Sequence, residues 1–232
     1  MTENEQKFLK ACEEGNLLTI KILLKAGVDP RIGGDYAIKY SALNGHLEIV
    51  KVLLKDSRVD PSIDNNAPIR YAAEKGHIDI VKLLLKDFRV DPSDMNNVAI
   101  RNASENGYTE IIKLLLKDSR VDLSVNNNWI FLTAAEKGYV EIVKLLLKDP
   151  RVNPADSNNA AIKYAVANNR IEVVTLLLQD PRVDPSDDDN LALRWAISYK
   201  NKEMIKLLLK DSRVKNSLTQ KILKEIEEIL KE

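Results

Sequence analysis

The chain has 232 residues, 44% of them hydrophobic and 30% charged, and its 35 basic residues balance 35 acidic ones to a formal net charge of zero. This composition is typical of a soluble protein with a large core, and it excludes a general attraction to nucleic acid or to a membrane surface. The single Cys12 excludes an internal disulfide and a cysteine-based metal site, and no run approaches the roughly 18 apolar residues of a membrane span, so we expect a cytoplasmic protein without a signal peptide.

The first 30 residues predict a helix pair that closes one end of a larger stack. Polar residues surround the apolar Phe8, Leu9, Ala11 and Cys12, so one face of the first helix suits water and the other suits packing. The segment that follows ends Leu-Leu-Lys-Ala-Gly-Val-Asp at residues 23–29. We interpret residues 1–30 as an N-terminal capping repeat.

Residues 31–214 contain six copies of one unit. The string Arg-Val-Asp-Pro-Ser recurs with small changes every 31 residues, as from Asp29 to the equivalent position 60 and onward to 215. Each copy predicts two helices joined at a glycine, as in residues 99–106, Gly107 and residues 110–117. The second helices carry apolar residues on more than one stripe, so neighbouring copies must cover them on two sides. The period therefore predicts stacked antiparallel helix pairs.

Two rows of equivalent residues support this stack. One residue before each predicted first helix stands an Asx side chain that would accept hydrogen bonds from free backbone amides, so we interpret this row as helix N-caps: Asp35, Asn66, Asn97, Asn128, Asn159 and Asn190. Small residues within the first helices would let neighbouring helices approach closely: Ser41, Ala72, Ala103, Ala134, Ala165 and Ala196.

The last segment, 215–232, departs from the repeat. Residues 217–220 read Ser-Leu-Thr-Gln, which predicts a capping box, and apolar residues follow at helical spacing from Leu218 to Leu230. We expect one amphipathic helix over 217–231 that closes the stack. The alternative for this helix is dimerisation.

Residues 67–77, Ala-Pro-Ile-Arg-Tyr-Ala-Ala-Glu-Lys-Gly-His, resemble the ankyrin repeat, whose pattern is Thr-Pro-Leu-His-x-Ala-Ala followed by Gly-His and a Leu-Leu run. The resemblance covers residue 1 to about residue 214. It implies a single all-α domain, an ankyrin-repeat solenoid of stacked antiparallel helix pairs. It also implies a non-enzymatic protein–protein interaction module, with repeats of this shortened kind pointing to a host cell cytoplasm if the chain is a viral or bacterial effector.

The chain departs from that pattern in two ways. The ankyrin unit has 33 residues, whereas here residues are lost before each first helix, so the β-hairpin fingers should be short or absent. Five repeats carry a basic residue where the pattern has His, and Leu132 is the exception: Lys39, Arg70, Arg101, Lys163 and Arg194. What replaces the hydrogen bonds of that His is left open.

The chain offers little reactive chemistry. His46 and His77 occupy equivalent positions after the inter-helix glycine, which favours a structural role over metal binding or catalysis. The acidic run 187–189 lacks the Gly and Glu of a calcium loop, so we interpret it as a solvated turn. A ladder of arginines, one per repeat, has an Asp two residues before each, which favours local ion pairs over phosphate binding. We expect no catalytic, cofactor or metal residues.

The aromatic residues carry the functional signal. If first-helix positions one, five, eight and nine face the concave groove, as in ankyrins, they place these rings there: Tyr36, Tyr40, Tyr71, Trp129, Tyr164, Trp195 and Tyr199. Tyr and Trp are enriched at binding hot spots. We therefore expect a monomer whose concave face binds an unidentified protein. The alternatives are that the rings only shield the helix backbone, and that the chain is a structural or engineered scaffold without a natural partner.

Overall fold

The computed structural model describes residues 1–123 and 128–231. Within these residues there are sixteen helices and no β-strand, which confirms the predicted all-α class. The longest of these helices has 13 residues, too few to cross a membrane. The residues group into two compact units, unit 1 (Met1–Asp122) and unit 2 (Leu123–Glu232). The interpretation as one domain with capping ends remains a prediction.

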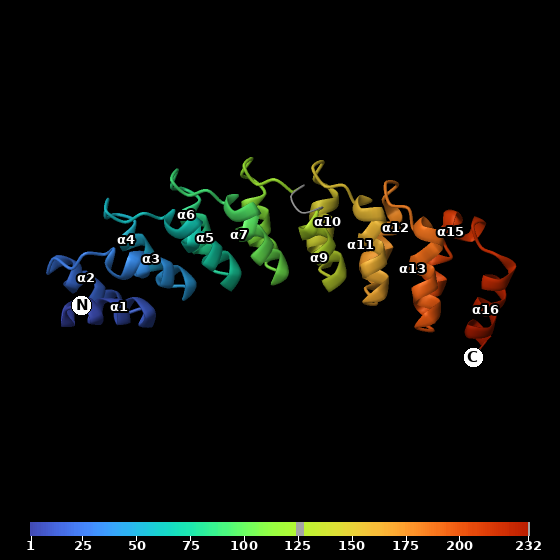
Figure 1. Cartoon of the computed structure of the whole chain (residues 1–232), viewed down its shortest axis with the longest axis horizontal. Helices are drawn as coiled ribbons and strands as arrows, with labels where there is room; N and C mark the ends of the chain where they lie inside the picture. Colours follow the sequence, from blue (N-terminus) through green and yellow to red (C-terminus); the bar gives the residue numbers. More distant parts are fainter. Residues whose placement is uncertain (124–127, 232) are drawn as a thin grey trace. The chain divides into compact units, whose positions relative to one another are not determined.

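Unit 1 is built from four helix pairs, each with a first helix and an antiparallel second helix. The pairs are α1 (Glu3–Glu14) with α2 (Leu17–Lys25), α3 (Ile32–Leu43) with α4 (Leu47–Leu53), α5 (Ile63–Lys75) with α6 (Ile78–Leu84), and α7 (Asp94–Glu105) with α8 (Thr109–Leu115). First helices contact first helices and second helices contact second helices, both in chain order (Figure 1). This arrangement confirms the predicted stacking of helix pairs.

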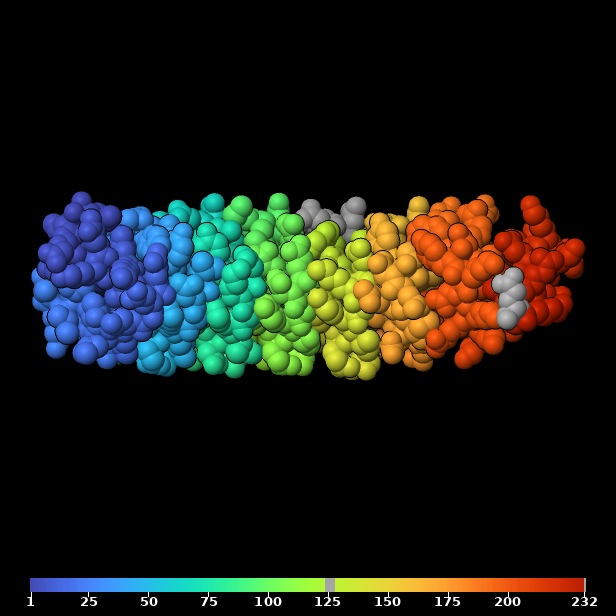
Figure 2. Space-filling view, turned by 90° about the horizontal axis from the view of Figure 1, so that it is seen from below, coloured from blue at the N-terminus to red at the C-terminus, as the bar shows by residue number. Residues whose placement is uncertain are grey.

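Unit 2 repeats the same arrangement and ends differently. Its helices are α9 (Trp129–Lys137), α10 (Val140–Leu147), α11 (Asp156–Ala167), α12 (Ile171–Gln179), α13 (Asp187–Ser198), α14 (Lys202–Leu208), α15 (Ser212–Asn216) and α16 (Gln220–Lys231). Helices α9, α11 and α13 contact one another in order, and α10, α12, α14 and α16 form the other layer. Within each unit the repeats appear as successive bands of the surface (Figure 2).

The core lies between the two helix layers and between neighbouring repeats. The predicted row of small residues is fully buried in the first helices, with Ser41 and Ala72 at 0% exposure. Second-helix residues such as Val50, Leu53 and Leu84 are buried as well. In the first repeat, Phe8 and Cys12 pack into the same core. Burial of apolar side chains on two sides is what ties each repeat to the next.

The first helices after α1 begin in a way that the sequence did not predict. In α3, α5, α7, α11 and α13, three consecutive residues near the start adopt left-handed backbone angles, with φ between 51° and 70°. Left-handed backbone costs roughly 1–2 kcal/mol for most residues, and Gly, Asn and Asp tolerate it best. All of these positions hold Gly, Asn or Asp except Met95 and Ser157. The polar composition of this segment therefore specifies a left-handed turn.

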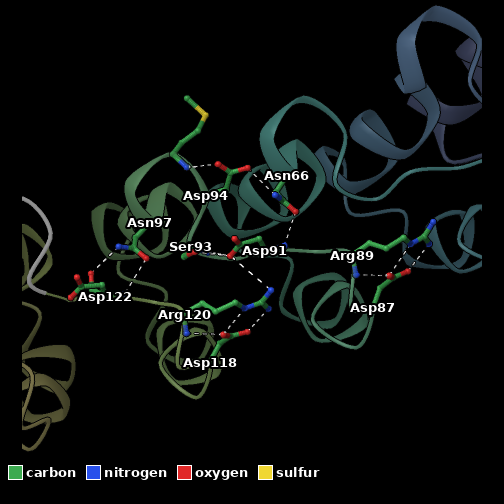
Figure 3. Close-up of polar contacts among 11 residues, drawn as sticks. Asn66, Asp87, Arg89, Asp91, Ser93, Asp94, Asn97, Asp118, Arg120 and Asp122 are labelled. Atoms are coloured by element: carbon green, nitrogen blue, oxygen red, sulfur yellow. Dashed lines mark hydrogen bonds and ion pairs between the residues drawn. The ribbon is translucent and has the colours of Figure 1, made fainter.

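The turn changes the role of the Asx row, which we had interpreted as helix N-caps. No side-chain capping bond is present at Asn128, and Asn66 lies in the left-handed turn with its side chain directed to the next repeat (Figure 3). Its Oδ1 accepts from the Asp91 N–H at 2.8 Å and its Nδ2 donates to Asp94 at 2.9 Å. Asn97 makes the same link to the Asp122 backbone, accepting at 3.3 Å and donating at 2.8 Å.

The N-cap prediction was therefore wrong in its chemistry, although the positions precede right-handed helix as expected. A left-handed residue directs its side chain away from the amides of its own helix, so the side chain bonds across the repeat boundary. In unit 2, Asn159 repeats the link to Asp184 and Asp187, and Asn128 donates to Asp156 at 2.6 Å. We name this row of side chains the asparagine bridges. Asp35, which holds the same position in the first full repeat, keeps a buried Oδ1 without a hydrogen-bond partner.

The same turn accounts for two of the basic residues that stand where the ankyrin pattern has His. Arg70 donates to the carbonyl oxygens of Asp64 and Asn65 at 2.8 Å each, and Arg194 donates to that of Asp188 at 3.0 Å. A long cationic side chain thus satisfies carbonyls that a left-handed turn leaves open. Lys39 instead reaches the Asp64 carboxylate of the next repeat at 2.5 Å.

The C-terminal helix is present but begins later than predicted. It spans Gln220–Lys231 and buries Ile226 and Ile229. The Ser217 hydroxyl accepts from Asn190 Nδ2 at 2.8 Å and donates to the Val214 carbonyl, so it is not the cap of this helix. The hydroxyl of Thr219 accepts from the Ile222 N–H at 3.4 Å in its place. The predicted capping box at Ser217 was wrong because the final asparagine bridge takes up that hydroxyl.

Candidate functional site

Six of the seven predicted rings lie on first helices and Tyr199 lies directly after α13, so that three rings belong to unit 1 and four to unit 2. In unit 1, Tyr36 and Tyr40 on α3 stack with ring centroids 3.8 Å apart and planes at 15°. The Tyr36 hydroxyl donates to the Glu13 carboxylate on α1, and this hydrogen bond raises the pKa of Tyr36 to about 12. Tyr71 on α5 is half-buried, and the Arg70 guanidinium lies 5.7 Å from its ring centroid. These contacts hold the unit 1 rings in place.

The unit 2 rings are more open. Trp129 on α9 and Trp195 on α13 are half-buried, whereas Tyr164 on α11 is 43% exposed and Tyr199, the residue that follows α13, is 62% exposed. Tyr164 and Trp195 occupy equivalent positions one repeat apart, on helices that contact each other. We name these four side chains the unit 2 ring surface. Large apolar groups exposed side by side are a common feature of interaction sites.

The position-five rings border the core and are not themselves fully buried. The residue that follows each position-five ring is buried, as with Ala165 after Tyr164 and Ala196 after Trp195. At the same position another repeat carries Thr133, which is 6% exposed. A small side chain can therefore be buried at this position, and a ring is not required there.

The histidines have the structural role that their spacing predicted. His46 Nε2 lies 2.8 Å from the Glu13 carbonyl oxygen and His77 Nε2 lies 3.0 Å from that of Leu43, so each ring binds the end of the preceding first helix. The rings also lie against the glycines of the preceding repeat. A Cβ on Gly45 would be 2.6 Å from the His77 ring, and Gly45 has φ of +80°. The close approach of the His77 ring and the positive φ together explain why position 45 holds a glycine.

The remaining reactive groups are held in structural contacts. Burial raises the pKa of the Cys12 thiol to about 12, which disfavours the nucleophilic thiolate. Asp187 accepts from Asn159 at 3.0 Å and lies 3.6 Å from Lys163, and these contacts lower its pKa. The acidic run 187–189 is thus partly an inter-repeat contact, not only the solvated turn we expected. Among the residues that the structure describes, no three His, Cys, Asp or Glu side chains group as metal ligands.

The arginine ladder consists of local ion pairs, as predicted. In every repeat the guanidinium binds both oxygens of the Asp two residues earlier, at 2.6–3.0 Å. Arg89, Arg182 and Arg213 also donate to carbonyl oxygens of the preceding repeat. The hydrogen bonds lower the pKa of the partner carboxyls, as at Asp87. The arginine side chains of this ladder therefore make hydrogen bonds within the fold.

One exposed aromatic residue escaped the sequence reasoning. Phe88 follows α6 in the turn to the next repeat and is 92% exposed, above every other large hydrophobic side chain of the described residues. Equivalent positions hold Ser57, Ser119 and Pro150. The sequence marks Phe88 as an aromatic residue at a position that holds Ser or Pro in other repeats. The expected binding rings were those of the first helices, and Phe88 lies outside them.

The family model described as ankyrin repeats (3 copies) matches this chain over residues 8–96, 100–189 and 131–220. A comparison with curated proteins finds no match. The family match spans both units and most of the chain.

Proposed function

The chain belongs to the ankyrin-repeat family, and from that premise we propose that it binds a protein partner through the rings of its first helices and has no catalytic activity of its own. Ankyrin repeats are in general protein–protein interaction modules and are typically not enzymes. The observation that carries the proposal is the unit 2 ring surface, where Tyr164 and Tyr199 are 43% and 62% exposed and the two tryptophans are half-buried. Such side chains bury much area on binding with little loss of rotamer freedom.

A protein is a better fit to these rings than a nucleic acid or a membrane. The chain has no net charge, and the guanidiniums that would bind phosphate are bonded to carboxylates of their own turns. We propose further that the chain is a monomer and that it binds its partner on the concave face expected of the family. We place it in the cytoplasm, or in the cytoplasm of a host cell if it is an effector. The lone buried Cys12 suits such a reducing setting.

The test is affinity capture with the full chain as bait from the source cell, followed by mass spectrometry. The matched baits are a Trp195→Ala/Tyr199→Ala double variant and a Lys148→Gln variant, whose substitution lies on the second-helix side of unit 2. A protein retained by the wild type and by Lys148→Gln but lost by the double variant supports the proposal. Equal retention by all three baits would show that the rings are not the site, and no specific retention would favour a scaffold without a partner.

A further inference from the structure

The second helices of unit 1 carry a feature that the ring surface does not explain. Phe88, at 92% exposure, stands at the tip of the turn after α6, where neighbouring repeats hold Ser57 and Ser119. The turn itself does not need a ring, because serine and proline serve at the equivalent positions. A ring this exposed offers apolar area to a ligand, and burial of that area would stabilise the complex.

Phe88 lines one of two hollows that share Lys86. One, of about 500 Å³, is bordered by Leu54, Lys55, Lys86 and Phe88, with Asp87 and Arg89 at its edge. The other, of about 390 Å³, lies between α6 and α8 and is bordered by Lys82, Leu85, Lys86, Leu114 and Lys117. Lys86 lines both hollows, and each is lined by leucine and lysine side chains. We name the two hollows together the lysine-rimmed surface.

The charge of this surface is positive because its acidic residues are already paired. Asp87 and Asp118 are bonded to Arg89 and Arg120, and Lys82 lies 3.4 Å from the Asp79 carboxylate. Three exposed lysines, one in each repeat, have no ion pair among the described residues: Lys55, Lys86 and Lys117. In unit 2 the equivalent row is interrupted, with Gln179 between Lys148 and Lys210. The uncompensated row is therefore a property of unit 1.

We propose that the lysine-rimmed surface binds an extended acidic peptide segment of a partner protein that also carries apolar side chains. The carboxylates would meet the three lysines, and an apolar side chain would cover Phe88 and the floor at Leu85 and Leu114. Repeats one helix diameter apart place the lysines at steps of about 10 Å. An extended peptide in the polyproline II conformation rises about 3.1 Å per residue with three residues per turn, so every third side chain faces the same way. The peptide should then carry an acidic residue at about every third position.

The chemistry of the surface favours a peptide over other polyanions. A phosphate backbone is best bound by bidentate arginines, and Arg89 and Arg120 are held by Asp87 and Asp118. A membrane surface requires several inserted apolar side chains, whereas Phe88 is the single strongly exposed one among the residues that line the two hollows. This inference does not rest on the unit 2 ring surface, which lies on first helices and directly after α13.

The experiment measures binding of a fluorescein-labelled nine-residue peptide, three repeats of Glu-Leu-Thr, to the full chain by fluorescence anisotropy. The wild type should bind saturably, and more weakly as salt rises. Phe88→Ser, which installs the residue of the neighbouring repeats, should weaken binding about tenfold. Lys86→Gln should weaken it several-fold and flatten the salt dependence. Lys148→Gln, the matched lysine of unit 2, and Trp195→Ala should stay within about twofold of wild type.

Three results would overturn the proposal. The first is equal binding of a peptide with Gln in place of Glu. The second is an equal loss with Lys86→Gln and Lys148→Gln, which would reduce the effect to overall charge. The third is tighter binding of single-stranded RNA or phosphatidylserine vesicles that is lost in the same unit 1 variants, which would assign the surface to another class of ligand. Because Phe88 is exposed, we expect the circular dichroism spectrum of Phe88→Ser to match that of the wild type. Lys86→Gln tests the same surface independently of Phe88→Ser.

Discussion

The side-chain amide of Asn66 accepts a hydrogen bond from the backbone N–H of Asp91 at 2.8 Å, so a buried side chain of one repeat fixes the turn that opens the next (Figure 3). Side-chain-to-backbone bonds of this kind complement the apolar contacts between repeats. They are specific in direction, because each asparagine reaches toward the C-terminal neighbour.

We expect Asn66→Ala to destabilise unit 1 by about 2–4 kcal/mol. The substitution leaves the Asp91 N–H without its partner, which costs roughly 1–3 kcal/mol, and it places Ala in a left-handed conformation, which adds roughly 1 kcal/mol. Asn65→Ala is the control, since Asn65 has the same left-handed backbone but an exposed side chain. Urea unfolding of both variants checks the difference, and equal losses would mean that the bridge contributes nothing.

Asp35→Asn should stabilise the protein at neutral pH. Burial raises the pKa of Asp35, and the nearby Asp60 carboxylate adds to the effect. A carboxyl with a raised folded-state pKa contributes stability below its unfolded pKa of about 3.9 that is lost as pH rises through the folded value. The gain from Asn should therefore appear above the titration of Asp35 and vanish at lower pH. Urea midpoints of both proteins across pH 3–8 measure this, and a gain independent of pH would contradict it.

Gly45→Ala should cost more stability than Gly27→Ala. Both glycines have positive φ, so both substitutions incur backbone strain of roughly 1–2 kcal/mol. At Gly45 the added Cβ would lie 2.6 Å from the His77 ring, whereas nothing lies within 4 Å at Gly27. The clash should add roughly 1–3 kcal/mol. Thermal unfolding compares the two, and relief of the extra cost by His77→Ala in the Gly45→Ala background would confirm its origin.

Loss of a ring from the unit 2 ring surface should affect partner binding more than folding. Tyr199→Ala should change the free energy of unfolding by no more than about 0.5 kcal/mol because Tyr199 is 62% exposed. Leu177→Ala, at a fully buried position in the same unit, should cost about 2–5 kcal/mol. Trp195→Ala should weaken binding of a captured partner by about 2 kcal/mol or more. If Trp195→Ala destabilises the fold as much as Leu177→Ala, the ring is a packing residue.

The glycine position illustrates how repeats adjust to one another. Where Gly45 receives the His77 ring, no side chain fits, but Asn169 occupies the same position in a later repeat. There the next repeat supplies Asn201, whose Nδ2 donates to Asn169 Oδ1 at 2.7 Å. The Gly45–His77 contact of unit 1 is thus replaced in unit 2 by two side-chain amides, Asn169 and Asn201, that form a hydrogen bond.

The sequence alone determined the helix pairs, their 31-residue period and their stacking, because these follow from apolar periodicity that repeats along the chain. It also predicted the arginine ion pairs and the structural histidines, since both depend on residues at fixed local spacing. The tertiary structure decided what the local pattern left open. An Asx residue before a helix suits an N-cap and a left-handed turn equally well, and only the position of the next repeat selects the bridge from Asn66 to Asp91. Likewise, the exposure of Phe88 depends on which neighbours cover a turn, which is a property of packing and not of spacing.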